Sequence, residues 1–233
     1  MVRYANPIIV ALDEMEKEEV ITTVRELGKK VWGYKLAGVV LKEGTRILDE
    51  IQKEVGLVNL FLDLQLSGTP EFIREAISIF SRPEVHFISC NAISGPVGIR
   101  TAFQTAHLTK ILVGSTLSSL SIADIKFLFD TIHREIKAYE FARLVRETRA
   151  YGLYCAAEEL DYLFHQSELN DITKVGVGIR PEWYPDKGYH TYTLTSKAVL
   201  ERRATYFVIG DPITKAENKI EAVERILKDI EYI

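Results

Sequence analysis

The stretch NLFLDLQLSGTPEFIREAISIF, residues 59–80, contains the unit from which the fold is built. It begins with a short apolar run, residues 59–64, of the kind that is buried on both faces of a parallel sheet. After a short loop, Thr69 and Pro70 have the positions of a helix cap and of a first-turn proline. The stretch therefore predicts a strand, a loop and a helix, in that order.

The same alternation of short apolar runs and longer amphipathic stretches continues along the whole chain. We predict strands at residues 7–12, 31–37, 59–64, 85–89, 110–114, 152–156, 171–178 and 205–210. Each is followed by a helical pattern, and the long region 117–149 is predicted to hold two helices. Eight such units in 233 residues predict an α/β fold, a closed (β/α)₈ TIM barrel that occupies residues 1–233 as a single domain. An open doubly wound sheet is the alternative, but no GxGxxG motif follows the first strand.

The bulk composition is that of an ordinary globular protein, with 47% apolar and 27% charged residues and a net charge of −4. This charge gives no general attraction to nucleic acids or anionic membranes. No apolar run approaches the roughly 20 residues that span a bilayer, and acidic residues come too early for a secretory signal. Cys90 and Cys155 form neither a disulfide framework nor a zinc pattern. We expect them to be reduced core residues of a cytoplasmic protein.

Reaction groups of such a barrel lie at the carboxyl ends of the strands and in the loops behind them. The candidates there are Asp13, Lys35, Asp63, Gln65, Asn91, Thr116, Gly178, Arg180, Gly210 and Asp211. Lys35 and Asp63 both interrupt buried runs, and opposite charges at neighbouring strand ends keep each other ionised. We therefore expect these two side chains to form an ion pair, either at a reaction site or as a purely structural pair.

Other candidates have a structural interpretation as well. Asp13 has the spacing of a cap for the next helix. Thr116 belongs to a serine and threonine cluster, residues 115–119, that also suits an ordinary turn. Gly178 and Gly210 offer backbone N–H groups where many barrels bind phosphate, although glycines also suit turns. The five histidines show no metal-binding spacing, so no metal site is predicted.

Taken in order, these residues resemble the orotidine 5′-monophosphate decarboxylase family. The resemblance covers nearly the whole chain and rests on VALD (10–13), YKLAG (34–38), FLDLQLSGTP (61–70), VGVGIRP (175–181) and VIGDPITKAEN (208–218). It implies a (β/α)₈ barrel, usually a homodimer, that uses no cofactor and removes CO₂ from orotidine monophosphate to give UMP. It further implies a small-molecule ligand of the nucleoside monophosphate class, with Asp13 at the ribose and Lys35 in the charged network.

The chain departs from the family pattern at both ends of the expected site. The family signature Asp-x-Lys-x-x-Asp reads Asp63-x-Gln65-x-x-Gly68 here. The resemblance thus implies that a proton-donating lysine is replaced by an amide and an aspartate from the partner subunit by glycine. The family's Gly-Arg pair, whose arginine binds the phosphate, reads Gly210-Asp211. Candidates for the missing positive charge are Arg180, Lys187, His190 and Lys215.

Three functions agree with this pattern: a working orotidine monophosphate decarboxylase, a divergent enzyme on the same barrel, and a non-catalytic relative that binds a nucleotide, a metabolite or a protein. In the second, Asp13, Asp63 and Asp211 bind a divalent cation or a less anionic substrate. We predict that Lys35 and Asp63 carry any catalysis. The predicted ligand-binding residues are Asp13, Gln65, Thr116, Gly178, Arg180, Gly210 and Asp211. The family reaction is expected to be absent or strongly impaired.

Overall fold

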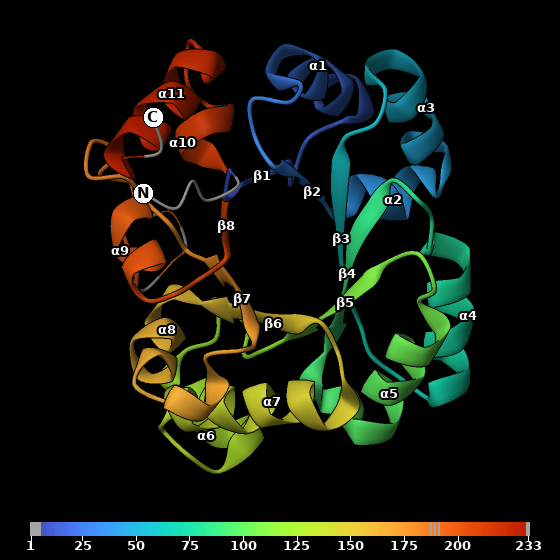
Figure 1. The fold of residues 1–233 in the computed structure, drawn as a ribbon, viewed down its shortest axis with the longest axis vertical. Coiled ribbons are helices and arrows are strands. Elements are labelled where there is room, and N and C mark those ends of the chain that lie inside the picture. The colour runs from blue at the N-terminus through green and yellow to red at the C-terminus, as the bar shows by residue number, and fades with distance from the viewer. Residues whose placement is uncertain (1–5, 187, 189, 191, 232–233) are drawn as a thin grey trace.

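The structure is a computed structural model that describes residues 6–186, 188, 190 and 192–231. Its parallel strands close into one barrel in chain order, with helices around the outside (Figure 1). The strands are β1 (Ile8–Ala11), β2 (Gly33–Leu36), β3 (Asn59–Leu66), β4 (Val85–Asn91), β5 (Lys110–Gly114), β6 (Gly152–Ala156), β7 (Thr173–Val177) and β8 (Tyr206–Ile209). The predicted TIM barrel is confirmed, and the closed strand order excludes the open sheet.

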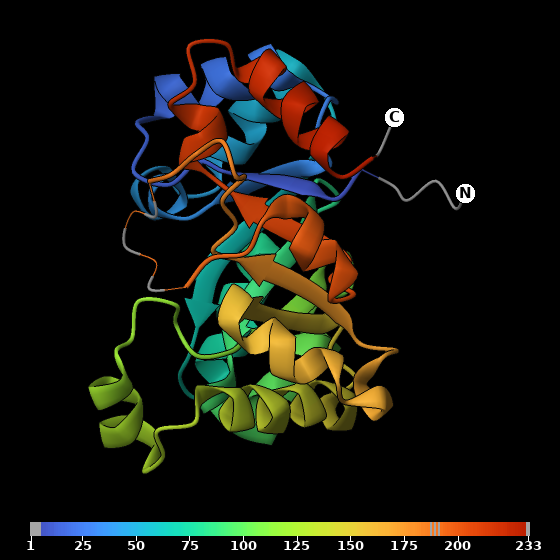
Figure 2. The ribbon, with the colours of Figure 1, turned by 90° about the vertical axis from the view of Figure 1, so that its left-hand side faces the viewer.

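The helices lie where the amphipathic stretches predict them. They are α1 (Lys17–Leu27), α2 (Gly38–Glu43), α3 (Arg46–Val55), α4 (Pro70–Phe80), α5 (Gly95–Thr105), α6 (Ile122–Phe129), α7 (Arg134–Thr148), α8 (Ala157–Phe164), α9 (Ser196–Glu201), α10 (Asp211–Thr214) and α11 (Lys219–Asp229), with 3₁₀ turns η1 (Ala92–Ser94) and η2 (Ser167–Leu169). The Thr69 hydroxyl accepts a hydrogen bond from the Phe72 N–H and Pro70 opens α4, as predicted. The region 117–149 holds two helices, and α6 projects away from the barrel (Figure 2).

Alternate side chains of the strands pack into two separate apolar layers. On β1, Ile9 points into the barrel, whereas Ile8 and Val10 pack between the sheet and the helices. The layer inside the barrel consists of Ile9, Phe61, Phe87, Leu112, Tyr154, Val175 and Val208. The middle of the barrel is therefore a packed core rather than a pore.

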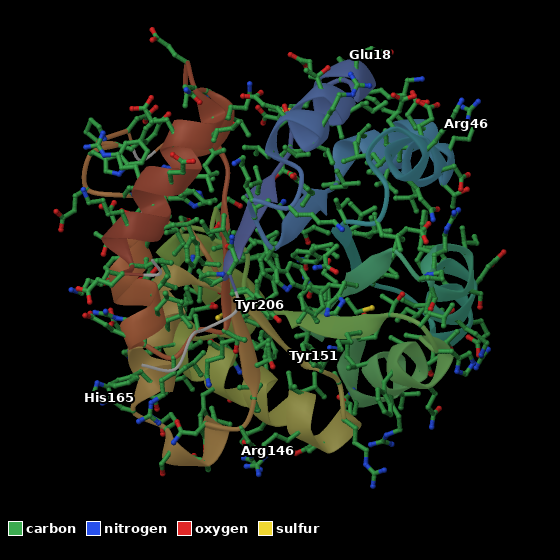
Figure 3. The ribbon with its side chains drawn as sticks, turned by 45° about the horizontal axis from the view of Figure 1, so that its top comes forward. Glu18, Arg46, Arg146, Tyr151, His165 and Tyr206 are labelled. Atoms are coloured by element: carbon green, nitrogen blue, oxygen red, sulfur yellow. The ribbon has the colours of Figure 1, made fainter. Side chains whose placement is uncertain are left out.

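Aromatic side chains fill the amino end of the barrel. The Phe87 ring centroid lies 5.0 Å from that of Trp32, 5.5 Å from that of Tyr151 and 5.7 Å from that of Tyr206. In Figure 3, Tyr151 and Tyr206 lie toward the middle of the ring of strands, while the labelled charged side chains lie on the outer elements. This end of the barrel is therefore filled, whereas the polar strand ends on the opposite side line a cavity.

The strand β3 is longer and less regular than predicted. It continues to Leu66, and its pairing with β4 shifts register between Leu62 and Leu66. Gln65 has a φ of 44°, in the left-handed region that residues other than glycine rarely adopt. The predicted strand end at residue 64 was wrong, because a register shift bends the ladder without ending it. Asp63 and Gln65, two residues apart, both line the mouth of the barrel.

Cys90 and Cys155 are both buried free thiols, as predicted, and burial raises the pKa of Cys90 to about 12. In the described part of the chain, no helix combines the length and the apolar character that crossing a membrane requires.

Candidate functional site

A cavity of about 470 Å³ opens at the carboxyl end of the barrel. Its lining includes Asp13, Lys35, Asp63, Gln65, Thr116, Gly178, Arg180, Gly210 and Asp211, all of which the sequence proposed as site residues. They converge because parallel strands place their carboxyl ends at one mouth. Ala11, Tyr154 and Val208 belong to both the cavity lining and the apolar interior, so they form the floor.

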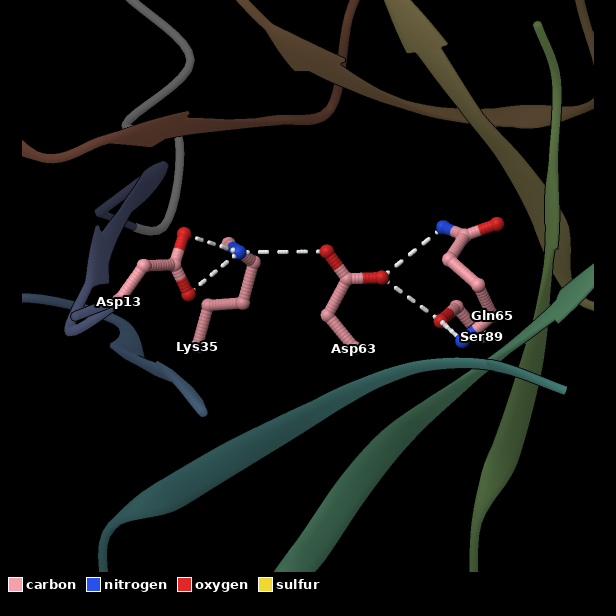
Figure 4. A network of polar contacts seen from close by, with 5 residues as sticks. All are labelled: Asp13, Lys35, Asp63, Gln65 and Ser89. Carbon is pink, nitrogen blue, oxygen red and sulfur yellow. Dashed lines mark hydrogen bonds and ion pairs between the residues drawn. The ribbon is translucent and has the colours of Figure 1, made fainter. Parts of the chain in front are cut away.

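At the inner end of the cavity, Lys35 lies between two carboxylates (Figure 4). Its Nζ donates to the two Asp13 oxygens at 2.9 and 2.6 Å and to Asp63 Oδ2 at 3.2 Å. Burial lowers the pKa of Lys35, but the Asp63 and Asp13 carboxylates outweigh that effect and raise the pKa above its ordinary value. The predicted Lys35–Asp63 ion pair is confirmed, and Asp13 joins it. Asp13 does not cap the next helix, since Glu16 is the cap residue of α1.

Asp63 connects this ion cluster to uncharged polar groups. Its Oδ1 accepts hydrogen bonds from Gln65 Nε2 at 2.9 Å and from the Ser89 hydroxyl at 2.8 Å (Figure 4). The backbone N–H of Gln65 donates to the Ser89 oxygen at 2.9 Å, and Asn91 Nδ2 donates to Gln65 Oε1 at 3.3 Å. Two carboxylates and one ammonium give the inner end a formal charge of −1, and the adjacent amides add none.

At the outer end of the cavity, two cations surround one carboxylate. Asp211 Oδ2 lies 3.2 Å from Lys215 Nζ and 3.8 Å from Arg180 Nη2. The buried Arg180 side chain is held in place because its Nε and Nη1 donate to the carbonyl oxygens of Asp186 and Ile179. Asp186 lines the same end of the cavity, so the two cations and the two carboxylates there have a formal charge of zero and the outer end is not negative.

His190, Gly178 and Gly210 complete the outer wall. Burial and the neighbouring Arg180 lower the pKa of His190 to about 4, so this imidazole adds no positive charge at neutral pH. Gly178 has a φ of 87°, and Gly210 directly precedes α10. Lys187, the remaining candidate cation, lies outside the described residues.

Thr116 is bonded to a carboxylate that sequence reasoning missed. Its hydroxyl donates to Oε1 of Glu159, a fully buried residue of α8 whose Oε2 accepts the Ala156 N–H at 3.0 Å. Burial raises the pKa of Glu159 to about 7, although the hydrogen bonds from Thr116 and Ala156 lower it. A carboxylate at the third position of a helix was the available signal for Glu159. Ser89, also missed, had one signal: a hydroxyl within the buried run of β4.

Three of the aspartates that line the cavity are each paired with a lysine. Asp13 and Asp63 bond to Lys35, and Asp211 bonds to Lys215. Within the described ranges, no group of three or more His, Cys, Asp or Glu side chains is arranged to hold a metal ion. The alternative in which the three aspartates bind a divalent cation therefore has no support from the geometry.

The sequence and the fold both match known proteins. The family described as Orotidine 5′-phosphate decarboxylase / HUMPS matches residues 6–226. The chain belongs to this family. The orotidine 5′-phosphate decarboxylase of Wolbachia sp. subsp. Brugia malayi is 30% identical over 230 residues, covering 97% of this chain and 99% of the relative. That of Campylobacter concisus is 27% identical over 229 residues, covering 96% and 99%.

Solved structures of the family have the same barrel. The crystal structure of orotidine 5′-phosphate decarboxylase from Lactobacillus acidophilus aligns with a TM-score of 0.79 at 23% identity, covering 97% of this chain and 99% of that one. The enzyme from Pyrococcus horikoshii aligns with a TM-score of 0.76 at 19% identity, covering 96% and 99%. One barrel supports many reactions, so the barrel alone does not determine the activity of this family member.

Proposed function

We propose that this chain is a divergent family member that binds a nucleoside monophosphate in the barrel mouth and decarboxylates orotidine monophosphate very slowly or not at all. The observation that carries the proposal is the inner end of the cavity. There the Lys35 ammonium is bonded to the Asp13 and Asp63 carboxylates, and the next side chain toward β4 is the amide of Gln65.

The missing element is a proton donor beside the reacting carbon. Loss of CO₂ leaves an electron pair on carbon, which a neighbouring acid must protonate. The three N–H bonds of Lys35 have carboxylate partners, and an amide such as Gln65 does not release a proton at a useful pH. Among the described lining residues, the other lysine and the arginine lie at the outer end. General acid catalysis is worth roughly 10²–10⁴-fold, and fixed charges at the reacting centre usually contribute more.

The outer end of the cavity supports phosphate binding. Arg180 and Lys215 offer two cations beside Asp211, and glycines line the same wall. Charge-assisted hydrogen bonds from arginine and lysine are the usual means of binding a phosphate dianion. This end therefore supports a phosphate monoester ligand, as the family relationship leads us to expect.

We also propose that the protein is a homodimer that associates through the rim of the mouth beside β3 and β4. Phe72, Ile93 and Val97 come from segments that directly follow these strands, and they are 51%, 66% and 63% exposed. Exposed apolar side chains gathered in this way favour association with another protein surface.

The assay follows the absorbance of orotidine monophosphate with purified protein. With the parent chain we expect no measurable decrease in this absorbance. Gln65→Lys should recover a little decarboxylase activity, and Gln65→Lys combined with Gly68→Asp should recover more. A Cβ atom at Gly68, whose φ is 150°, would lie 3.0 Å from the Phe72 ring, so Phe72→Ala accompanies that change to make room. Phe72→Ala alone is the matched control: it should remain inactive, and because Phe72 lies on the proposed association surface it should also keep the mass of the parent in light scattering.

The same assay tests the second candidate function, that of a genuine orotidine 5′-phosphate decarboxylase. The relatives named above, which are orotidine 5′-phosphate decarboxylases, favour this alternative. Turnover by the parent chain within about tenfold of ordinary family members would contradict the proposal that this chain has lost the family activity. A tenfold difference in rate corresponds to only ~1.4 kcal/mol of activation free energy. A thermal shift with UMP tests the binding half of the proposal separately.

A further inference from the structure

The last residue of β5, Gly114, lies directly against the side-chain amide of Gln65. A Cβ atom on Gly114 would stand 2.2 Å from Gln65 Oε1 and 3.0 Å from its Nε2. Gly114 pairs with Asn91 of β4 and Tyr154 of β6 as an ordinary strand residue, and its φ lies outside the left-handed region. The backbone conformation therefore does not require glycine at this position. The position of the Gln65 amide does require it, because a side chain on residue 114 would overlap the amide.

Three strands hold this amide in one orientation. Its Oε1 faces Gly114 and accepts from Asn91, and its Nε2 donates to Asp63. The left-handed backbone of Gln65, which costs free energy for a residue with a side chain, is held by the bond from its N–H to Ser89. Strain that is held by surrounding hydrogen bonds is a feature of functional positions rather than of ordinary strands.

The fixed amide determines which ligand groups fit the inner end. Nε2 carries two hydrogens and bonds Asp63 with one of them, so the other is available to a ligand oxygen. A carboxylate brought to the same place meets the Asp63 and Asp13 carboxylates, which exceed Lys35 by one negative charge. An uncharged hydrogen-bonding group avoids that repulsion.

We propose that Gly114 is a specificity-determining residue. The space left by its missing side chain holds the Gln65 amide against Asp63, and the inner end thereby binds an uncharged polar group and rejects a carboxylate. The inference rests on the proposed function, since it names the ligand class of the same cavity. That class is a phosphate monoester whose other end is uncharged, represented by UMP rather than by its carboxylated counterpart, orotidine monophosphate.

The test is calorimetric titration of UMP and orotidine monophosphate into the parent chain, Gly114→Ala, Gln65→Ala and the double variant. The parent should bind UMP at least tenfold more tightly than orotidine monophosphate, about the effect of one unfavourable charge contact. Gly114→Ala should weaken UMP binding about tenfold, because the new methyl group displaces the amide and its hydrogen bond is lost. The atoms that give way are the far end of a flexible side chain, so this variant should still fold.

The double variant separates this mechanism from a general packing effect. Once Gln65→Ala has removed the amide, adding Gly114→Ala should change UMP affinity by less than about twofold. Gly38→Ala is the matched control, because a Cβ atom there meets no atom within 4 Å and the backbone is not left-handed. Its affinities should equal those of the parent.

The possible failures are distinguishable. Equal losses from Gly114→Ala with and without the Gln65 amide would overturn the role of Gly114. Orotidine monophosphate binding as tight as UMP binding would overturn the selection and leave the proposed nucleotide binding intact. If neither UMP nor ribose 5-phosphate bound the parent chain, the proposed function and the inference would both fail. A thermal-unfolding cycle on the same four proteins would still show whether Gly114 and Gln65 are coupled.

Discussion

A single buried ammonium bonds both carboxylates at the inner end of the cavity, which leads to a prediction at the residue scale. The Lys35 and Asp63 side chains are 6% and 11% exposed. Removing Lys35 therefore leaves a buried carboxylate without its partner. We expect Lys35→Ala to lower the free energy of unfolding, measured in urea, by about 3–5 kcal/mol. Lys17→Ala breaks a more exposed pair with Glu50 and should cost less than about 1 kcal/mol. Equal urea midpoints for Lys35→Ala and the parent would contradict the buried cluster.

At the outer end, we expect Asp211 to limit the binding of a phosphate group. It lies 3.2 Å from Lys215 and 3.8 Å from Arg180, so it competes with a ligand phosphate for both cations. Asp211→Arg removes this competitor and adds a third cation. The dissociation constant for UMP should fall about tenfold or more, since a hydrogen bond to a charged group is worth roughly 1.5–3 kcal/mol.

Calorimetry with three ligands checks this prediction and its location. Ribose 5-phosphate should gain about the same factor as UMP, because the change acts on the phosphate. Uridine, which has no phosphate, should bind parent and Asp211→Arg alike. Unchanged affinity for both phosphorylated ligands would contradict the placement of the phosphate beside Asp211.

At the scale of elements, Glu159 links α8 to the loop after β5 and makes stability depend on pH. Its pKa in the folded protein is raised from an ordinary 4.5 to about 7. A carboxyl group with a raised pKa favours folding fully below the ordinary value, and this contribution is lost as the pH rises through about 7. The free energy of unfolding should therefore fall between about pH 4.5 and pH 7, by up to about 3 kcal/mol at 1.36 kcal/mol per pKa unit.

The measurement is urea unfolding across this pH range for the parent chain, Glu159→Gln and Glu158→Gln. The difference between the parent and Glu159→Gln isolates this group from other titrating residues. In Glu159→Gln the free energy of unfolding should depend less on pH than in the parent. Glu158, whose side chain is 47% exposed, is the control, and Glu158→Gln should show the same pH dependence as the parent. The same slope in all three proteins would mean that Glu159 titrates normally.

At the scale of the whole molecule, the exposed apolar rim predicts association. Light scattering should give twice the chain mass of 26.5 kDa. Ile93→Glu combined with Val97→Glu should give the single-chain mass, because two carboxylates in an apolar contact cost more than the association gains. Leu57→Glu is the control, since Leu57 is 61% exposed but precedes β3 at the opposite end of the barrel. A dimer that persists in the double variant would place the interface elsewhere.

The amino-acid sequence by itself determined the barrel, the family and the set of residues at its mouth. Strands buried on both faces and amphipathic helices are properties of short stretches, so their alternation is readable without coordinates. Once that alternation specifies a parallel barrel, topology places Asp13, Lys35, Asp63 and Arg180 at one end. The order of these residues along the chain was also sufficient to show the resemblance that the family match confirms.

Only the tertiary structure decided which atoms meet inside that mouth. Asp13 bonds to Lys35 rather than capping a helix, Thr116 bonds to a glutamate 43 residues away, and the Gln65 amide lies against Gly114. These contacts depend on the register shift in β3 and on the closure of the barrel, which bring distant strands within a few ångströms. Hydrogen bonds form or fail over a few tenths of an ångström, whereas a sequence pattern specifies only the face and the end of a strand. The local sequence therefore determines which polar residues lie at the mouth, and the closed barrel determines which of them bond to one another.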